Sequence, residues 1–71
     1  MPKERDSGFA AGLRAERNRA DMSQEELAKA VGVSTSSVIN WESGEYMPSL
    51  ATTIRLADVL GCTLEQLAGR A

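Results

Sequence analysis

Residues 24–43, QEELAKAVGVSTSSVINWES, contain the pattern that decides the expected fold of this chain. Ser23 precedes the stretch and Glu26 lies three residues after Ser23, which is the spacing of a capping box at a helix start. Gly32 enters a left-handed conformation at a helix end without steric cost. Ser34 can then cap a second helix. The stretch therefore predicts two short helices joined by a tight turn.

The apolar residues of this stretch repeat at the spacing of helices that share a core. The small Ala28 allows the two helices to cross closely, and Val33 fills the turn between them. The residues expected to face inward are Leu27, Ala28, Val31, Val33, Val38 and Trp41. A helix, a short turn with glycine and a second helix form the unit that places its second helix in a DNA major groove.

The composition bounds the possible classes of protein. The chain has 71 residues, enough for one domain with a small core. No apolar run approaches the roughly 20 residues of a membrane span, and the charged N-terminus MPKERDSG does not read as a secretion signal. A single cysteine excludes an intrachain disulfide, and the lack of histidine argues against a zinc site. We expect no cofactor, no metal and a reducing, cytoplasmic location.

Charge is unevenly distributed along the chain, whose formal net charge is −2. Residues 1–23 carry five basic and four acidic side chains, and residues 50–71 are neutral. Between them, residues 24–49 carry Lys29 against four glutamates, a balance of −3. This distribution lowers the expected non-specific affinity for nucleic acid, which comes mainly from Lys and Arg beside phosphates.

The N-terminal part predicts a flexible arm followed by a further helix. Residues 1–6 are charged and are expected to form the arm, and residues 7–71 a single domain. Ser7 can cap a helix that runs to about Ala20. One stripe of this helix comprises Phe9, Leu13, Arg17 and Ala20. An arginine in an apolar stripe needs a partner, unless Arg17 lies on a solvated face instead.

The C-terminal part predicts two more helices. Gly44 and Pro48 have the chemistry of a turn, after which Ser49 can cap a fourth helix that ends at Gly61. The residues of this helix expected to face inward are Leu50, Ile54, Leu56, Ala57 and Leu60. Thr63 can cap a short fifth helix that carries Leu64 and Leu67 three residues apart.

From Phe9 to Leu67 the chain resembles the phage-repressor and Cro-like (XRE-type) helix-turn-helix family. The matching segments are RNRADMSQEELAKAVGVSTSSVINWESG, MPS and LATTIRLADVLGCTLEQL. The resemblance implies an all-α, compact five-helix, lambda-repressor-like domain that binds double-stranded operator DNA as a small transcriptional regulator, commonly as a homodimer. It also implies a structural ion pair between Arg17 and Glu42. Such a protein is bacterial or phage-encoded and nucleoid-associated when bound to DNA.

Base contacts are expected from a recognition helix at about residues 35–42. Ser36 and Asn40 lie four residues apart and therefore share one face, and Asn can bond bidentately to adenine. By the resemblance, Thr35, Ser36 and Asn40 read bases, and Gln24 approaches the backbone and outer bases. The full expected set is Thr35, Ser36, Ser37, Asn40 and Gln24. Alternatively, the three residues 35–37 are small polar residues typical of any helix start.

Phosphate contacts are expected from few cations. Relatives often carry basic residues around the glycine after the recognition helix, whereas this chain has Ser43, Glu45, Tyr46 and Met47 there. The expected contacts are Arg14, Arg19, Lys29, Ser43 and Tyr46, with Lys3 and Arg5 on the arm as further cations. We expect about three to five phosphates to be neutralised per protomer, and hence a shallow dependence of affinity on salt.

A second function fits the same fold, namely a protein-interaction module or antitoxin-like partner with weak or no DNA binding. The acidic residues 24–49 and the lack of basic residues in the following loop favour this alternative. An enzyme with a small-molecule substrate is not expected, because the chain has no histidine, no glycine-rich phosphate loop and little room for a cleft. Glu25 and Glu26 suit the dipole of a helix N-terminus rather than acid–base catalysis.

Four further residues have two interpretations each. Trp41 is expected in the core rather than as a platform for base stacking, and Cys62 in the core rather than as a redox switch. Leu64 and Leu67 either close the core of the monomer or, with Val59, donate apolar surface to a dimer.

Overall fold

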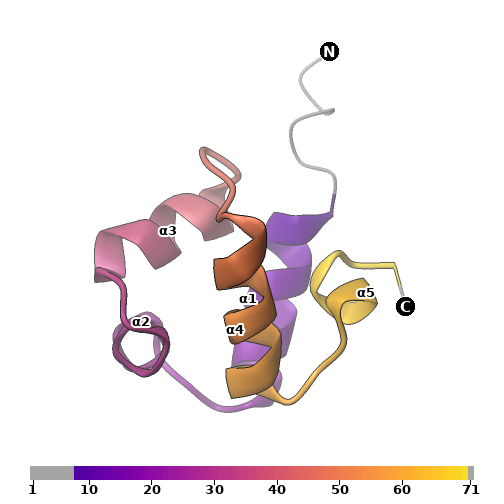
Figure 1. Cartoon of the computed structure of the whole chain (residues 1–71), viewed down its shortest axis with the longest axis horizontal. Coiled ribbons are helices and arrows are strands. Elements are labelled where there is room, and N and C mark those ends of the chain that lie inside the picture. The colour runs from indigo at the N-terminus through magenta and orange to yellow at the C-terminus, as the bar shows by residue number, and fades with distance from the viewer. Residues whose placement is uncertain (1–7, 71) are drawn as a thin grey trace.

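The computed structural model describes residues 8–70, and α-helices account for most of them (Figure 1). The helices are α1 (Phe9–Arg19), α2 (Gln24–Val31), α3 (Thr35–Ser43), α4 (Leu50–Leu60) and α5 (Leu64–Leu67). Residues 8–70 contain no strand. The expected all-α, five-helix fold is therefore confirmed. The predicted arm, residues 1–6, lies outside the described residues.

Hydroxyl side chains cap the starts of four helices, as the sequence predicts. Ser23, Ser34, Ser49 and Thr63 each accept a hydrogen bond from the backbone N–H three residues later. At α2 the carboxylate of Glu26 also accepts the N–H of Ser23, which completes the capping box. The helix ends follow the same regularity, since left-handed glycines end α2, α3 and α4.

The start of α1 differs from the prediction, because the capping position is Gly8 rather than Ser7. Ser7 itself lies outside the described residues. Gly8 has a φ of +100°, and a Cβ there would lie 2.6 Å from the carbonyl oxygen of Ala68. One turn later, a Cβ on Gly12 would lie 2.1 Å from the carbonyl oxygen of Leu67. The backbone of Leu67 and Ala68 therefore packs directly on the start of α1, because glycine has no Cβ at positions 8 and 12.

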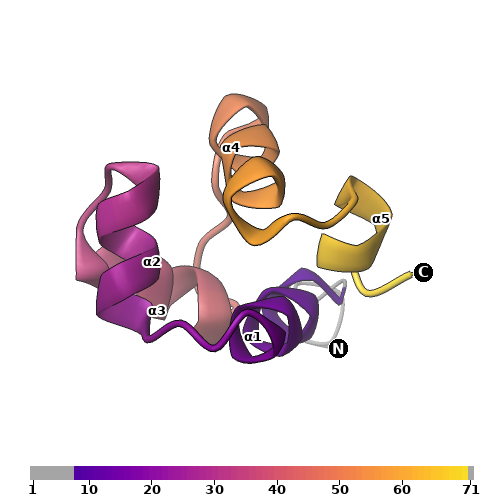
Figure 2. The same ribbon diagram turned by 90° about the horizontal axis from the view of Figure 1, so that it is seen from below.

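The helices enclose one apolar core. Figure 2 shows α1, α2, α4 and α5 arranged around a common centre. Each predicted inward residue of α2 and α3 is buried, and Val33 and Met22 pack against the core. The completely buried side chains include Leu13, Leu27, Val38, Leu56 and Leu67. The core is thus assembled from all parts of the described chain.

The predicted inward stripe of α4 is partly wrong. Leu56, Ala57 and Leu60 are buried, but Leu50 is 70% exposed and Ile54 is 45% exposed. At about 100° per residue, Leu50 lies about 120° and Ile54 about 160° around the helix from Leu56. One helix face cannot bury all of them, and packing selected the side that carries Leu56.

The two leucines of α5 lie in different environments. Leu67 is fully buried and closes the core, whereas Leu64 is 42% exposed. Val59 and Cys62 are half-buried and pack against the core. Burial raises the pKa of the Cys62 thiol, which favours the protonated and less nucleophilic form. Of the described helices, none combines the length and the apolar character needed to cross a membrane.

Candidate nucleic-acid interface

The outward face of α3 is polar. Ser36 and Ser43 are exposed and Asn40 is half-exposed, and the three lie within about 60° of one another around the helix. Val38 and Trp41 are buried on the opposite side. The side chains that hold α3 in the core and those that face solvent are therefore on separate faces.

Ile39 adds an apolar side chain to this face and was not among the contacts predicted from the sequence. It is 46% exposed and lies next to Asn40. The signal was available, because Ile39 falls outside the stripe formed by Val38 and Trp41. An exposed branched side chain on a helix that enters a major groove can contact the methyl group of thymine.

Thr35 and Ser37 occupy the first turn of α3 and are half-buried. The backbone N–H of Ser37 donates to the hydroxyl of Ser34 at 3.2 Å, and the two serine hydroxyls lie 3.0 Å apart. Ser37 is thus part of the helix cap. This agrees with the alternative that residues 35–37 are small polar residues of a helix start.

Glu42, in the last turn of α3, is only 4% exposed and pairs with Arg17 of α1. Arg17 Nε donates to Glu42 Oε2 at 2.6 Å and Arg17 Nη2 donates to Oε1 at 3.1 Å, which is a bidentate arrangement. Arg17 Nη1 donates to the carbonyl oxygen of Met22 at 2.8 Å. The hydrogen bond to Glu42 raises the pKa of Arg17, against a smaller opposing effect of burial. The ion pair implied by the resemblance is present, and Arg17 does not lie on a solvated face.

Two further side chains bond to Glu42. Gln24 Nε2, at the start of α2, donates to Glu42 Oε1 at 3.1 Å. Arg14 Nη1 donates to the backbone carbonyl oxygen of Glu42. We call Arg14, Arg17, Gln24 and Glu42 the Glu42 cluster. It links α1, the start of α2 and the end of α3.

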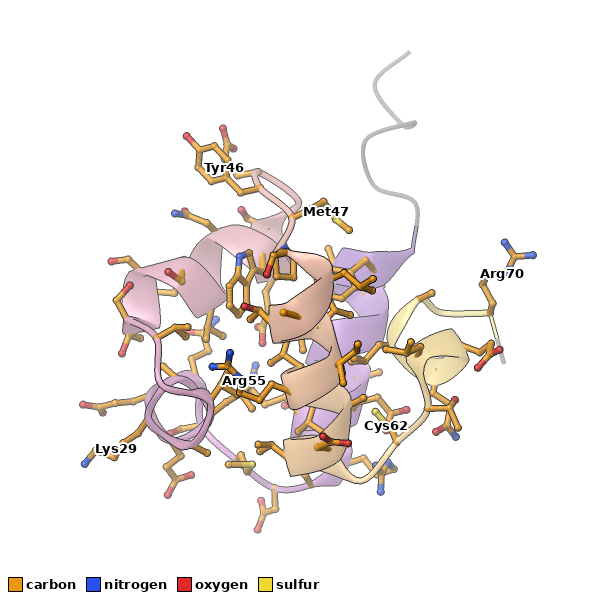
Figure 3. The ribbon with its side chains drawn as sticks, viewed as in Figure 1. Lys29, Tyr46, Met47, Arg55, Cys62 and Arg70 are labelled. Atoms are coloured by element: carbon orange, nitrogen blue, oxygen red, sulfur yellow. The ribbon has the colours of Figure 1, made fainter. Side chains whose placement is uncertain are left out.

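Four of the expected phosphate contacts come from three parts of the molecule. Lys29 belongs to α2, Ser43 and Tyr46 belong to α3 and the loop after it, and Arg14 belongs to α1 and bonds to the end of α3. Arg14 bonds to the end of α3, and its side chain is otherwise exposed. Lys29 projects outward from α2, and Tyr46 projects from the loop after α3, away from the helical body (Figure 3). Ser43 is exposed, and its hydroxyl donates to the carbonyl oxygen of Asn40 at 3.0 Å.

Arg19 is bonded to a different part of the molecule. Its Nε donates to Glu16 Oε1 at 2.7 Å, and its Nη2 donates to the carbonyl oxygen of Leu60 at 3.1 Å. Leu60 is the last residue of α4. The guanidinium of Arg19 is therefore engaged at the C-terminal end of α4 and not at α3.

The surface around α3 is less acidic than residues 24–49 suggest, because the charge of Glu42 is buried and matched by Arg17. The exposed carboxylates of this stretch are Glu25, Glu26 and Glu45. One of them, Glu26, is engaged in the capping box of α2. Lys29 and Arg14 offset part of the remaining negative charge.

Comparison with known proteins assigns the chain to a family. The sequence model of a family described as helix-turn-helix matches residues 13–67. An uncharacterized HTH-type transcriptional regulator of Archaeoglobus fulgidus is 40% identical over 55 residues, which cover 78% of this chain and 79% of that protein. The cryptic phage CTXphi transcriptional repressor RstR of Vibrio cholerae is 31% identical over 58 residues, which cover 82% of this chain and 52% of RstR.

Solved structures share the fold of this chain. The restriction-modification controller protein C.AhdI from Aeromonas hydrophila superposes with a TM-score of 0.79 and 33% identity, over 84% of this chain and 91% of that protein. The hydroxypropylphosphonic acid epoxidase from S. wedmorenis superposes with a TM-score of 0.79 and 34% identity over 86% of this chain, but over only 32% of the epoxidase. Because the family match includes α2, α3 and the turn between them, this chain belongs to the phage-repressor and Cro-like (XRE-type) helix-turn-helix family.

Proposed function

We propose that the protein is a small transcriptional regulator, a repressor or Cro-like protein, that binds double-stranded operator DNA with α3 in the major groove. The outward face of α3 carries the proposal. Ser36, Asn40 and Ser43 lie together on this face while Val38 and Trp41 hold the other side in the core. These side chains can reach base edges without any change in the packing of the domain.

The proposed base contacts are Thr35, Ser36, Ser37, Asn40 and Gln24. Asn40 contributes most, because its amide can bond both to N6 and to N7 of adenine. Ser36 can donate or accept, and Ile39 adds apolar contact with a thymine methyl. Thr35 and Ser37 contribute less, since both are half-buried and Ser37 is bonded within the cap of α3.

The proposed phosphate contacts are Arg14, Lys29, Ser43, Tyr46 and Arg19. Arg14 is the strongest of them, because it lies beside the end of α3 and keeps further N–H groups available. Arg19 is the weakest, because its guanidinium is bonded to Glu16 and Leu60. With about three to five phosphates per protomer, log K should fall against log[salt] with a slope of about −3 to −4.5 per protomer, and about twice that for a dimer. A slope equivalent to more than about six phosphates per protomer would contradict this count.

We also propose that the protein acts as a homodimer on a two-fold operator, because one recognition helix reads few base pairs. Of the residues expected to form the dimer surface, Leu67 is fully buried and Val59 half-buried. Leu64 is exposed, and Leu50 and Ile54 on α4 add exposed apolar surface. The proposed dimer surface therefore comprises Leu50, Ile54 and Leu64.

The proposal includes no catalytic role and no membrane partner. Its setting is the cytoplasm of a bacterium, with a bacterial or phage gene, and the nucleoid when the protein is bound. The likeness to an epoxidase does not argue for an enzyme, because this chain spans only 32% of the epoxidase.

A second candidate is a protein-interaction module, as in an antitoxin-like partner. Two exposed apolar side chains favour it, since Tyr46 is 62% exposed and Met47 is 59% exposed on the loop after α3. Replacing both with serine should abolish such an interaction. The same change should leave the choice of bases by α3 intact, because Ser36 and Asn40 are unaltered.

The test is selection of random DNA duplexes at low salt, with the wild type beside an Asn40→Ala/Ser36→Ala variant. We expect the wild type to enrich a two-fold motif that the variant loses. Unchanged thermal unfolding of the variant shows that the loss is not due to misfolding. A well-folded wild type that enriches no sequence would contradict the proposal and favour the protein-partner function.

A further inference from the structure

We propose that Glu42 is a positioning residue that sets which polar atoms of Gln24 face the DNA, and so determines a base preference at the outer edge of each half-site. The inference rests on the proposed function, because it presupposes that Gln24 meets the duplex. It goes beyond the ion pair with Arg17, which by itself would only join α1 to α3. The observation that carries it is the third hydrogen bond of Glu42, from Gln24 Nε2 at 3.1 Å.

The chemistry of the two groups determines the orientation of the Gln24 amide. A carboxylate can only accept hydrogen bonds, so the NH₂ group of Gln24 and not its carbonyl oxygen must face Glu42. The amide plane is therefore assigned by the bonding partner, although the two ends of an amide look alike. Because one N–H is used by Glu42, the carbonyl oxygen and the second N–H are left for another partner.

Arg17 fixes the position of this carboxylate. Its two hydrogen bonds, at 2.6 Å and 3.1 Å, orient both oxygens of Glu42, and the oxygen Oε1 serves Arg17 and Gln24 together. Glu42 is only 4% exposed, so water competes little for this oxygen. Gln24 is half-buried and belongs to the first turn of α2, whose backbone is held by the capping box of Ser23. Both ends of the Gln24 side chain are thus constrained.

The fixed orientation of the Gln24 amide determines which donor and acceptor atoms it offers to a base. An amide that presents its carbonyl oxygen together with an N–H matches adenine, which offers the N6 amino group as donor and N7 as acceptor. A freely rotating amide would also contact phosphates and other bases. We therefore expect a preference for adenine at one outer base pair of each half-site, separate from the bases read by Ser36 and Asn40.

A double-mutant cycle tests this coupling. Gln24→Ala is made in the wild type and in the Arg17→Met/Glu42→Met background, where two apolar side chains of similar size replace the buried pair. We expect Gln24→Ala to reduce affinity for the preferred operator about tenfold in the wild type and less than about threefold in the methionine background. The preference at the outer base pair should weaken in that background, whereas Asn40→Ala should cost the same in both.

A control for the loss of a glutamate charge alone is Glu65→Gln, which removes such a charge from the exposed surface of α5. It should leave the preference at the outer base pair unchanged, so a general effect of charge is distinguished from positioning. An equal effect of Gln24→Ala in both backgrounds would overturn the inference, as would no effect in the wild type. If the folded wild type selected no sequence at all, the proposed function itself would fail and the inference with it.

A second measurement needs no variant and remains available if the methionine background does not fold. The ¹⁵N relaxation of the Gln24 side-chain amide in the free wild type should give an order parameter on the order of 0.8, as for a rigid group. The side-chain amide of Gln66, whose carbonyl oxygen accepts the N–H of Thr63, serves as the comparison because its NH₂ has no such carboxylate partner in residues 8–70. A Gln24 value below about 0.6 would show a mobile amide and overturn the inference.

Discussion

The α2–α3 half and the α4–α5 half of this molecule begin their helices in the same way but differ in their contacts and surfaces. α3 is joined to α1 through the charged side chains of the Glu42 cluster. α5 is joined to α1 by direct backbone approach at Gly12. The outward face of α3 carries mainly polar side chains, whereas α4 exposes Leu50 and Ile54.

The difference shows that helix caps and surfaces carry separate information. Four hydroxyl caps specify where the helices start in both halves, and none of them indicates a partner. The partners follow from the side chains left outside, since a polar helix face suits base edges and an exposed apolar one suits another protein.

The largest effect is expected from breaking the buried ion pair. Arg17→Met leaves the Glu42 charge buried with only Gln24 as side-chain donor, and should reduce the free energy of unfolding by about 4 kcal/mol. A small domain loses most of its stability by such a change. Thermal and urea unfolding followed by circular dichroism measures it. The Arg17→Met/Glu42→Met variant should return to within about 1 kcal/mol of the wild type, and a double variant as unstable as the single one would contradict this account.

The two leucines of α4 should respond very differently to the same truncation. Leu56→Ala removes a completely buried side chain and should cost about 3 kcal/mol of unfolding free energy. Leu50→Ala removes a side chain that is 70% exposed and should change the free energy of unfolding by less than about 0.5 kcal/mol. Urea unfolding of both variants measures the contrast. Equal losses would mean that Leu50 is buried in solution and that α4 is rotated from the described orientation.

The junction of α1 and α5 should not tolerate a methyl group. Gly12→Ala places a Cβ 2.1 Å from the carbonyl oxygen of Leu67, so α5 must shift, at an expected cost of about 2 kcal/mol despite the better helix propensity of alanine. Gly61→Ala is the reference, because nothing lies within 4 Å of its Cβ and only its φ of +66° causes strain. Hydrogen exchange should show faster opening of α5 in Gly12→Ala alone. Unchanged exchange in α5 would argue against the backbone contact.

Removing one cap from each half should have equal and smaller effects. Ser34→Ala at α3 and Ser49→Ala at α4 each delete one hydrogen bond to a backbone N–H and should each cost about 1 kcal/mol. Only Ser34→Ala should also weaken DNA binding, because it loosens the first turn of the recognition helix. If Ser49→Ala weakened DNA binding as much, α4 would have to contribute to DNA binding together with α3.

The smallest effect on stability is expected from charging the exposed face of α4. Leu50→Lys/Ile54→Lys should leave the free energy of unfolding of the monomer within about 0.5 kcal/mol of that of the wild-type monomer. Sedimentation equilibrium at tens of micromolar should show a dimer for the wild type and a monomer for the variant, since apposed lysines repel. A wild type that is monomeric under these conditions would remove dimerisation in free solution. Any dimer would then form on DNA.

Local chemistry in the sequence determined the helices of this protein. The spacing of Ser23 and Glu26, the left-handed Gly32 and the hydroxyls at Ser34, Ser49 and Thr63 act over three or four residues, so they can be recognised without knowledge of the fold. The same holds for the separation of Val38 and Trp41 from Ser36 and Asn40 on α3. The pairing of Arg17 with Glu42 was available only through the resemblance to a family, because the two residues lie 25 positions apart.

Tertiary structure alone decided the features that depend on which helix faces meet. α4 carries more apolar residues than one face can hold, and packing buried Leu56 while it left Leu50 and Ile54 exposed. The role of Gly12 arises only when the carbonyl oxygen of Leu67 approaches it. The bonds of Gln24 and Arg14 to Glu42 likewise need α1, α2 and α3 in place. Propensity and spacing act along the chain, whereas these contacts depend on how the helices pack together in space.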